Sequence, residues 1–151
     1  HTVVSHAAKF LIKKGYQFDY VCEVYAPNPF LKISDLKKGL KKIKSKKYDY
    51  VFSATRYLFP FFRSFTFSQR KGIKMLFEKN LKTRSQDLKE IICDAGQFYW
   101  GHKRTWIKEK KITKNANLIM IPIWRYKDLD TLEDWKRAEL FNKFLKSSKK
   151  L

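Results

Sequence analysis

Hydrophobic residues recur along the chain with two different spacings, and each spacing predicts a type of element. Apolar residues three and four positions apart over residues 3–12 predict a helix, which Gly15 can end. Short apolar runs over residues 20–25 and 50–54 predict two buried strands. Between them, Ser34 can cap a helix that carries apolar residues on one face and lysines on the other. This strand–helix–strand order predicts a parallel α/β sheet.

The second half of the chain returns to this order after an irregular segment. Residues 97–100 and 118–121 predict further strands, and an apolar stripe predicts a last helix that starts near Thr131: Leu132, Trp135, Ala138, Phe141 and Leu145. Over residues 57–89, aromatic residues crowd among basic ones without a clean period. On a monomer they would leave apolar area in water, so we expect an arm that packs on another subunit. Residues 1–151 are otherwise expected to form a single domain.

Charge is the most conspicuous feature of the composition. Thirty-four Lys and Arg residues against fourteen Asp and Glu residues give a net charge of +20, which suggests a polyanionic partner such as nucleic acid. However, most of these cations are lysines interleaved with apolar residues, which is typical of solvated helix faces, and we favour that interpretation. No apolar run is long enough for a membrane span. Two cysteines, Cys22 and Cys93, are no disulfide framework and indicate a reducing compartment such as the cytoplasm.

The acidic residues are scarcer and more informative. Five of the fourteen lie in one short stretch: Asp128, Asp130, Glu133, Asp134 and Glu139. Asp128 and Asp130 follow a predicted strand with a spacing of two, so both carboxylates can point the same way and hold Mg²⁺ together with substrate phosphates. The alternative is helix capping, because Asp130 and Asp134 flank the start of the predicted last helix, whose dipole favours anions.

Two further motifs could contact a substrate. In Arg84-Ser85-Gln86-Asp87, the arginine can grip a carboxylate or phosphate with two hydrogen bonds, although an exposed arginine on a loop is the alternative. Gln97 and Tyr99 would share one face of their strand and offer an amide and a hydroxyl, unless that strand only fills the core. No glycine-rich phosphate loop is present, and the chain begins on a helix. We therefore expect a domain that lacks its opening strand–helix unit.

Five motifs in this order carry a resemblance to a known family: Tyr25-Ala26-Pro27-Asn28-Pro29-Phe30-Leu31, Asp49-Tyr50-Val51-Phe52-Ser53-Ala54-Thr55, Arg84-Ser85-Gln86-Asp87-Leu88, Asp94-Ala95-Gly96-Gln97-Phe98-Tyr99-Trp100-Gly101 and Asp128-Leu129-Asp130-Thr131-Leu132-Glu133-Asp134-Trp135. From about His6 to Leu145, the chain resembles the acylneuraminate cytidylyltransferase family. The fourth motif points to the pseudaminic acid branch rather than the neuraminic one. The resemblance implies a Rossmann-like nucleotide-diphospho-sugar transferase fold with an inserted dimerisation arm.

The resemblance also implies a reaction and roles for individual residues. CTP and a nine-carbon 2-keto sugar acid, pseudaminic acid for this branch, would give the CMP-sugar and pyrophosphate. Asp128 and Asp130 would form the catalytic pair and hold Mg²⁺. The arm would join two subunits into a homodimer and deliver basic residues such as Arg63 into the partner's site. Further substrate contacts are implied at these positions: Arg84, Gln86, Gln97, Tyr99 and Tyr25.

The same resemblance predicts what this chain lacks. The family's first strand and the loop that cradles the CTP phosphates have no counterpart, so we expect an N-terminally truncated domain that does not turn over CTP alone. Pro27-Asn28 stands where related enzymes usually carry small or hydroxyl residues. Two other functions stay open, a basic nucleic-acid-binding module and an inactive, dimerising remnant of the enzyme. A role in glycosylating surface structures such as flagella follows from the resemblance.

Overall fold

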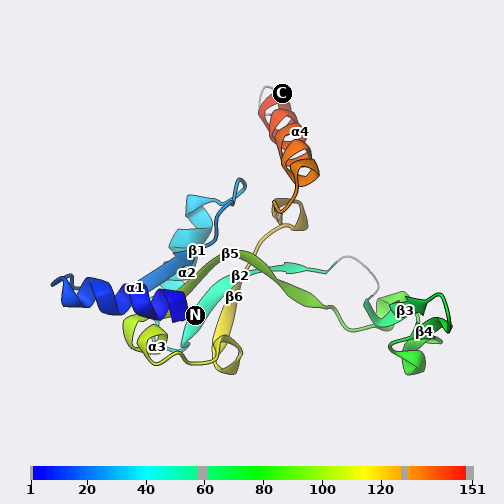
Figure 1. Ribbon diagram of the computed structural model, residues 1–151, viewed down its shortest axis with the longest axis horizontal. Helices are drawn as coiled ribbons and strands as arrows, with labels where there is room; N and C mark the ends of the chain where they lie inside the picture. Colours follow the sequence, from blue (N-terminus) through cyan, green and yellow to red (C-terminus); the bar gives the residue numbers. More distant parts are fainter. Residues whose placement is uncertain (1, 58–60, 127–128, 149–151) are drawn as a thin grey trace.

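A four-stranded sheet forms the centre of the molecule in the computed structural model, which describes residues 2–57, 61–126 and 129–148 (Figure 1). The strands lie in the order β1-β5-β2-β6. Their bounds are Tyr20–Val24 for β1, Tyr50–Arg56 for β2, Ile92–His102 for β5 and Ala116–Met120 for β6. β2 and β6 run parallel, whereas β5 runs antiparallel to both of its neighbours, β1 and β2. The fold is therefore mixed α/β, which confirms the predicted α/β class.

The parallel arrangement predicted from the element order holds for β2 and β6 but is wrong for β5. The reason lies in where the chain re-enters the sheet. The backbone N–H of Tyr57 donates to the carbonyl of Ile91 at 2.8 Å, so β5 starts beside the end of β2. A strand that starts where its neighbour ends must run antiparallel to it. A parallel strand would need a connection that crosses back over the sheet, and the described residues between β2 and β5 form none.

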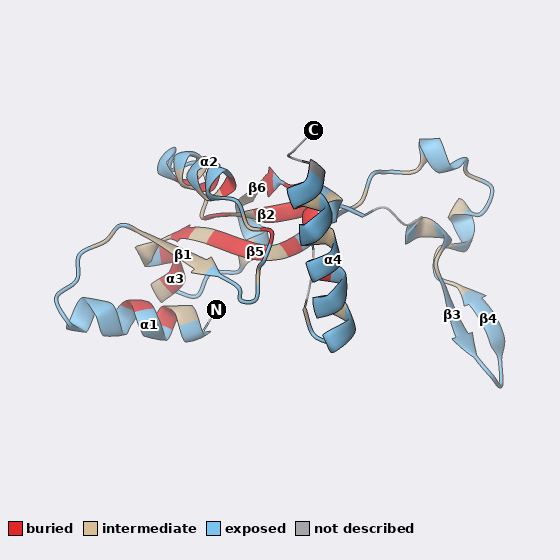
Figure 2. Ribbon diagram, turned by 90° about the horizontal axis from the view of Figure 1, so that it is seen from above, coloured by how far each residue is buried: buried red, intermediate tan, exposed pale blue. Residues whose placement is uncertain are grey.

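Helices cover both faces of the sheet. α2 (Ile33–Lys44) lies on one face, whereas α1 (Thr2–Lys13) and the short α3 (Lys103–Ile107) lie on the other (Figure 2). α4 (Leu132–Ser148), the last helix of the chain, projects away from the sheet (Figure 1). None of the helices formed by the described residues is long and apolar enough to cross a membrane.

The two faces of the sheet carry two separate hydrophobic cores. The core under α2 is made of side chains from the helix and three strands: Ile43, Val51, Phe98 and Ile119. The core under α3 is aromatic and contains Tyr50, Tyr99 and Trp106. Tyr50 and Trp106 meet edge to face with ring centroids 5.0 Å apart, a favoured geometry for aromatic pairs. Alternation along β5, with Phe98 toward one core and Tyr99 toward the other, is what divides them.

A bulge interrupts the pairing of β5 with β2. Phe52 pairs with Tyr99 and Ala54 pairs with Asp94, so residues 95–98 of β5 lie opposite Ser53 alone. The hydroxyl of Ser53 accepts hydrogen bonds from the backbone N–H groups of Gln97 and Phe98, at 3.0 and 3.3 Å. It thereby satisfies donors that the ladder leaves unpaired. The bulge includes Gly96 at a φ of 56°, a left-handed conformation that costs glycine little.

The segment between β2 and β5 leaves the sheet and forms an arm on one side of the molecule (Figure 1). Within it, β3 (Phe65–Ser68) and β4 (Gly72–Met75) pair as a short antiparallel hairpin that the aromatic pattern did not predict. The rings near the base of the arm pack on one another: Tyr57, Phe61, Phe62 and Phe77. The hairpin itself is exposed, with Phe67 at 72% and Ile73 at 68% exposure.

Three details of the helices differ from the predicted pattern. α2 begins at Ile33 after Lys32, so Ser34 lies inside the first turn and does not cap the helix. In the stripe predicted for the first helix, Ala8 is buried, whereas Val3 is 79% exposed. In the stripe of α4, Ala138 is buried and the ring of Phe141 packs on Phe30 and Trp124, but Leu132 is 82% exposed.

A substitution at Gly39 tests whether close packing or helix propensity has the larger effect on the stability of α2. A Cβ atom at this position would come within 2.6 Å of Cδ1 of Trp100 and 3.0 Å of Phe98. The indole cannot easily retreat, because its Nε1 donates to the carbonyl of Leu36 at 3.1 Å. We expect Gly39→Ala to lower the free energy of unfolding by about 1–2 kcal/mol through overpacking, despite the better propensity of alanine. Urea denaturation measures the change.

The exposed Lys37 on the same helix provides the control for this substitution. Lys37→Ala should change the free energy of unfolding by less than about 0.5 kcal/mol. A Gly39→Ala protein as stable as the parent would mean that α2 does not approach β5 as closely as described.

Candidate active site

Two neighbouring cavities lie beside the bulge, where β1 ends. The smaller has a volume of about 190 Å³ and lies between residues 25–28, residues 94–96 and Tyr126. The larger has a volume of about 490 Å³ and also contains Tyr25 and Asp94, together with Tyr99 and Phe52. In sheets of this class, ligands bind beyond the carboxyl ends of the parallel strands. The position of the smaller cavity after β1 and next to the segment after β6 makes it the candidate active site.

Tyr25 and Asp94 line both cavities, and Tyr99 lines the larger one. The hydroxyl of Tyr99 donates to Oδ2 of Asp94 at 2.5 Å, and the backbone N–H of Gly96 donates to Oδ1 at 2.8 Å. The rings of Tyr25 and Tyr99 pack with centroids 5.5 Å apart. Burial, followed by the hydrogen bond to Asp94, raises the pKa of Tyr99 well above its usual range. Burial also raises the pKa of Tyr25. Both phenols therefore stay protonated and can orient a substrate.

The structure places Gln97 in the core and not at these cavities. The residue is 2% exposed, and its Nε2 donates to the backbone carbonyl of Arg125 at 2.8 Å. The bulge causes this placement, because it breaks the simple alternation from which a common face with Tyr99 was predicted. Of the two strand residues predicted to meet a sugar, Tyr99 lines the larger cavity and Gln97 supports the chain behind it.

Asp35 and Arg125 form a buried ion pair that sequence reasoning missed. Asp35 lies in the first turn of α2, Arg125 ends the short 3-10 turn Ile123–Arg125, and their side chains are 6% and 4% exposed. Nε and Nη1 of Arg125 have no hydrogen-bond partner among the described residues. In the sequence, Asp35 resembles an ordinary first-turn acid and Arg125 one of many cations, so no pattern distinguished them. The pair holds the segment after β6 against α2.

The segment after β6 leads to the predicted acidic pair. Asp128 lies outside the described residues. Asp130 is exposed, and its carboxylate makes no hydrogen bond or ion pair with any described residue. Instead, Thr131 and Asp134 cap α4: Oγ1 of Thr131 accepts from the backbone N–H of Asp134 at 3.2 Å, and Oδ2 of Asp134 accepts from the backbone N–H of Thr131 at 3.1 Å. Capping thus engages Asp134 and leaves the carboxylate of Asp130 available.

Hydrogen bonding to Thr131 lowers the pKa of Asp134, so the cap is charged at neutral pH. Within residues 2–57, 61–126 and 129–148, no group of three or more His, Cys, Asp or Glu side chains could hold a metal ion.

The arm residues Arg63, Arg84 and Gln86 lie apart from both cavities. Nη2 of Arg63 donates to the carbonyl of Thr83 at 2.9 Å, which fixes the arginine within the arm. Gln86 lies in the turn Ser85–Asp87, with its amide against the guanidinium of Arg84. None of the three lines a cavity beside the bulge, and the arm extends away from the sheet (Figure 1). Within one chain, the structure does not bring them to Tyr25 and Tyr99.

Comparison with known proteins confirms the resemblance on which these assignments rest. No family profile matches the chain. The chain is 32% identical over 142 residues, or 93% of its length, to a pseudaminic acid cytidylyltransferase of Campylobacter jejuni serotype O:2, and equally similar to that of serotype O:23/36. It spans 61% of the length of each of these relatives. It is also 31% identical over 106 residues to a Helicobacter pylori protein, and the match covers 70% of this chain and 20% of that protein. That protein is named as pseudaminic acid cytidylyltransferase and UDP-2,4-diacetamido-2,4,6-trideoxy-beta-L-altropyranose hydrolase.

The buried pair of Asp35 and Arg125 predicts a strong and non-additive effect on stability. Arg125→Met leaves the carboxylate of Asp35 buried without its cation, so we expect the free energy of unfolding to fall by about 3–5 kcal/mol. The double variant Asp35→Leu/Arg125→Met, which removes both charges, should recover most of that loss. Chemical denaturation of the parent, the two single variants and the double variant measures this cycle.

An exposed pair provides the matched control. Arg137 and Glu133 pair on the surface of α4 with side chains 61% and 71% exposed. Arg137→Met should cost no more than about 1 kcal/mol, because an exposed pair contributes little. Equal losses for Arg125→Met and Arg137→Met would contradict the burial of the Asp35–Arg125 pair.

Proposed function

We propose that the chain is part of a cytidylyltransferase that joins CTP to pseudaminic acid and releases pyrophosphate. The observation that carries this proposal is the similarity over 93% of the chain to proteins named for this activity. The cavities beside the bulge support it, since their aromatic rings and hydroxyl groups are suited to a polar sugar. Both cysteines are free thiols, which fits a cytoplasmic location.

The chemistry proposed is attack of the sugar's anomeric hydroxyl on the α-phosphorus of CTP. Tyr25 and Tyr99 would orient the sugar through hydroxyls that stay protonated, since the pKa of each is raised by burial. Asp94 would fix the phenol of Tyr99. The carboxylate of Asp130, which capping does not engage, would hold Mg²⁺ together with Asp128 and phosphate oxygens. The bound ion would neutralise charge on the phosphates as pyrophosphate leaves.

A homodimer built through the arm is part of the proposal. The support is the apolar area that the arm exposes around its hairpin: Phe65, Phe67, Ile73, Leu76 and Leu81. Covering such side chains with a second subunit would remove them from water. A second subunit could also bring Arg63 and Arg84 to a site that their own chain does not let them reach.

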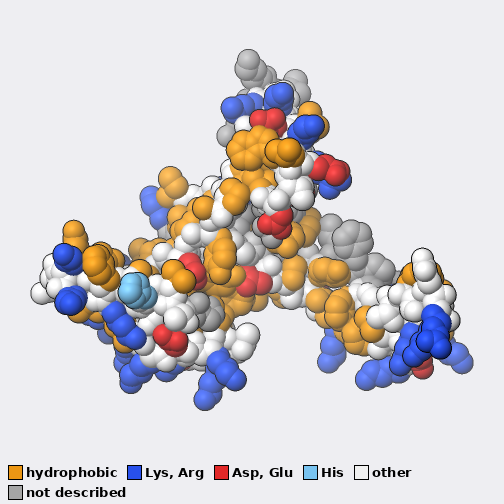
Figure 3. All heavy atoms as spheres, in the orientation of Figure 1, with side chains coloured by type: hydrophobic (Ala, Val, Ile, Leu, Met, Phe, Trp, Pro, Cys, Tyr) orange, Lys and Arg blue, Asp and Glu red, His pale blue; other side chains and the backbone are white. Residues whose placement is uncertain are grey.

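The distribution of charge supports the enzyme over a nucleic-acid-binding module. On the face shown in Figure 3, Lys and Arg side chains gather at the outer ends of the molecule, over α1 and α3, the arm and the tip of α4. Acidic side chains lie both near its middle and among these cations on α4 and the arm. On this face, the mixture of charges suits a solvated lysine-rich surface better than a continuous basic groove.

The acidic pair provides the direct test of the proposed reaction. In full-length protein, formation of CMP-pseudaminic acid from CTP should require Mg²⁺ and should be abolished by Asp130→Asn or Asp128→Asn, because each change removes a ligand charge. Chromatography of the nucleotide products measures transfer, and circular dichroism checks that the fold is kept. The control is Glu139→Gln, which removes an acid farther along α4 and should leave transfer unchanged.

Normal transfer by both Asn variants would refute the metal assignment. Transfer of CMP to pseudaminic acid in the complete absence of divalent cations would refute it as well.

The arm predicts the oligomeric state separately from the chemistry. We expect the parent to sediment as a dimer, and Phe67→Ser/Ile73→Ser to sediment as a monomer, because the double change removes apolar area from the proposed interface. Phe10, which is 52% exposed on α1, gives the control Phe10→Ser, which should stay dimeric. A monomeric parent at micromolar concentration would argue against the arm as a dimer contact.

A further inference from the structure

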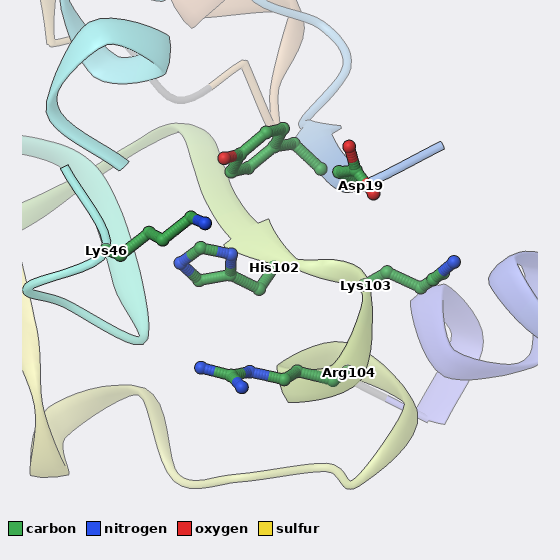
Figure 4. A pocket seen from close by; sticks show the side chains of 6 residues that line it. Asp19, Lys46, His102, Lys103 and Arg104 are labelled. Atoms are coloured by element: carbon green, nitrogen blue, oxygen red, sulfur yellow. The ribbon is translucent and has the colours of Figure 1, made fainter. Parts of the chain in front are cut away.

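A third cavity lies at the end of the sheet opposite the candidate active site. It has a volume of about 310 Å³ and is lined by the start of β1, the end of β5, the start of α3 and the turn after α2. Its residues are Asp19, Tyr20, Lys46, His102, Lys103 and Arg104 (Figure 4). Tyr20 is the first residue of β1 and His102 the last of β5, whereas Tyr25 follows the other end of β1. The two sites are therefore separate.

Two cations in this cavity have no ionic partner among the described residues. Neither the ammonium of Lys46 nor the guanidinium of Arg104 makes an ion pair or hydrogen bond with a described residue. In Figure 4 both extend toward the side of the cavity where the His102 ring lies, whereas Lys103 points away. The ammonium of Lys103 lies over the ring of Phe18, 5.8 Å from its centroid. Two positive charges thus face one space with no partner.

The acidic groups near the cavity do not neutralise these two cations. Asp19 is the one acid among the lining residues, and in Figure 4 it lies on the side away from Lys46 and the guanidinium of Arg104. Asp49, which also acts on His102, is held by Lys110 with Oδ2 and Nζ 3.0 Å apart. The balance of charge on the Lys46 side is therefore positive.

The excess of positive charge contributes to a lowered pKa of His102. Burial lowers the pKa of its imidazole, the charges of Arg104 and Lys46 lower it further, and Asp49 and Asp19 oppose them. Its Nε2 is shielded from solvent and has no hydrogen-bond partner among the described residues. The ring packs on Tyr20 with centroids 5.2 Å apart, which fixes its orientation. A buried ring nitrogen without a partner, between two cations, is an incomplete polar site.

The backbone of Lys46 is also strained. Its φ is 60°, in the left-handed region where a helix end usually carries glycine. A lysine there is strained by about 1 kcal/mol.

We propose that this cavity binds a phosphate-type oxyanion, held by Lys46 and Arg104 and by the protonated ring of His102. The anion supplies the missing counter-charge and accepts hydrogen bonds from the guanidinium and the imidazolium. Binding is coupled to proton uptake, since the neutral ring of the free site becomes charged when the anion is present. Affinity consequently rises as the pH falls through the histidine titration range.

A sulfate titration that is monitored through the NMR signals of the histidine ring protons tests this site. Sulfate keeps its charge across the histidine range, so a change in affinity with pH reports the protein alone. We expect a saturable shift of the His102 signals, an increase in the pKa of His102, and little response from the exposed His6. Inorganic phosphate should compete with sulfate.

Variants separate the proposed site from the general attraction of a +20 surface. Lys46→Gln and Arg104→Gln should each weaken sulfate binding about tenfold or more, because each removes one charged hydrogen-bond donor. Lys41→Gln removes the same charge from the exposed side of α2 and should change affinity less than about twofold. Lys46→Gly, which relieves the left-handed backbone, should keep or raise the Tm while losing the response to sulfate.

Three results would overturn the proposal. One is equal sulfate affinity in the parent and in the Lys46, Arg104 and Lys41 variants. Another is a pKa of His102 that saturating sulfate does not move. The third is binding of duplex oligonucleotide at His102 that neither sulfate nor phosphate displaces, which would assign the cavity to nucleic acid.

Discussion

The buried contact between Asp35 and Arg125 is the interaction on which the rest of the candidate site depends. It joins the start of α2 to the segment after β6, and the carbonyl of Arg125 accepts a hydrogen bond from Gln97 in the bulge of β5. Three parts of the chain that are distant in sequence are thus fixed to one another by one guanidinium group and its backbone. Because both charges are removed from water, the geometry is strongly preferred over any arrangement that separates them.

The bulge of β5 is the second constraint, and Gln97 links it to Arg125. By turning Gln97 inward toward Arg125, it leaves Asp94 and Tyr99 to face the cavities. The hydroxyl of Ser53 compensates for the lost ladder bonds. The Asp-Ala-Gly-Gln-Phe-Tyr run that resembles the cytidylyltransferases therefore has a structural meaning as well. Its glycine adopts the left-handed conformation in the bulge, and its glutamine lies in the core. Its tyrosine lines the larger cavity.

Periodicity predicted what depends on local spacing. The helices α1, α2 and α4 and the four strands of the sheet lie where the apolar patterns placed them. The resemblance implied sugar contacts for both Tyr25 and Tyr99, and the centroids of their rings lie 5.5 Å apart. It could not predict the direction of β5, because this depends on where the arm rejoins the sheet. Nor could it predict the ion pair of Asp35 and Arg125, since burial of a charge requires a partner that is distant in sequence. The sequence also left open whether Asp130 or Asp134 caps α4. The hydrogen bonds between Thr131 and Asp134 assign the cap to Asp134.

The attachment of the arm to the sheet allows the sequence and length of the arm to vary. Its two ends are adjacent, joined by the hydrogen bond from Tyr57 to Ile91. The entropic cost of a loop with fixed ends grows only slowly with its length. Insertions, deletions and altered aromatic residues in the arm can therefore accumulate without changing the pairing of β2 with β5. The surface of the arm can change on one side of that hydrogen bond while the residues of the cavities on the other side are retained.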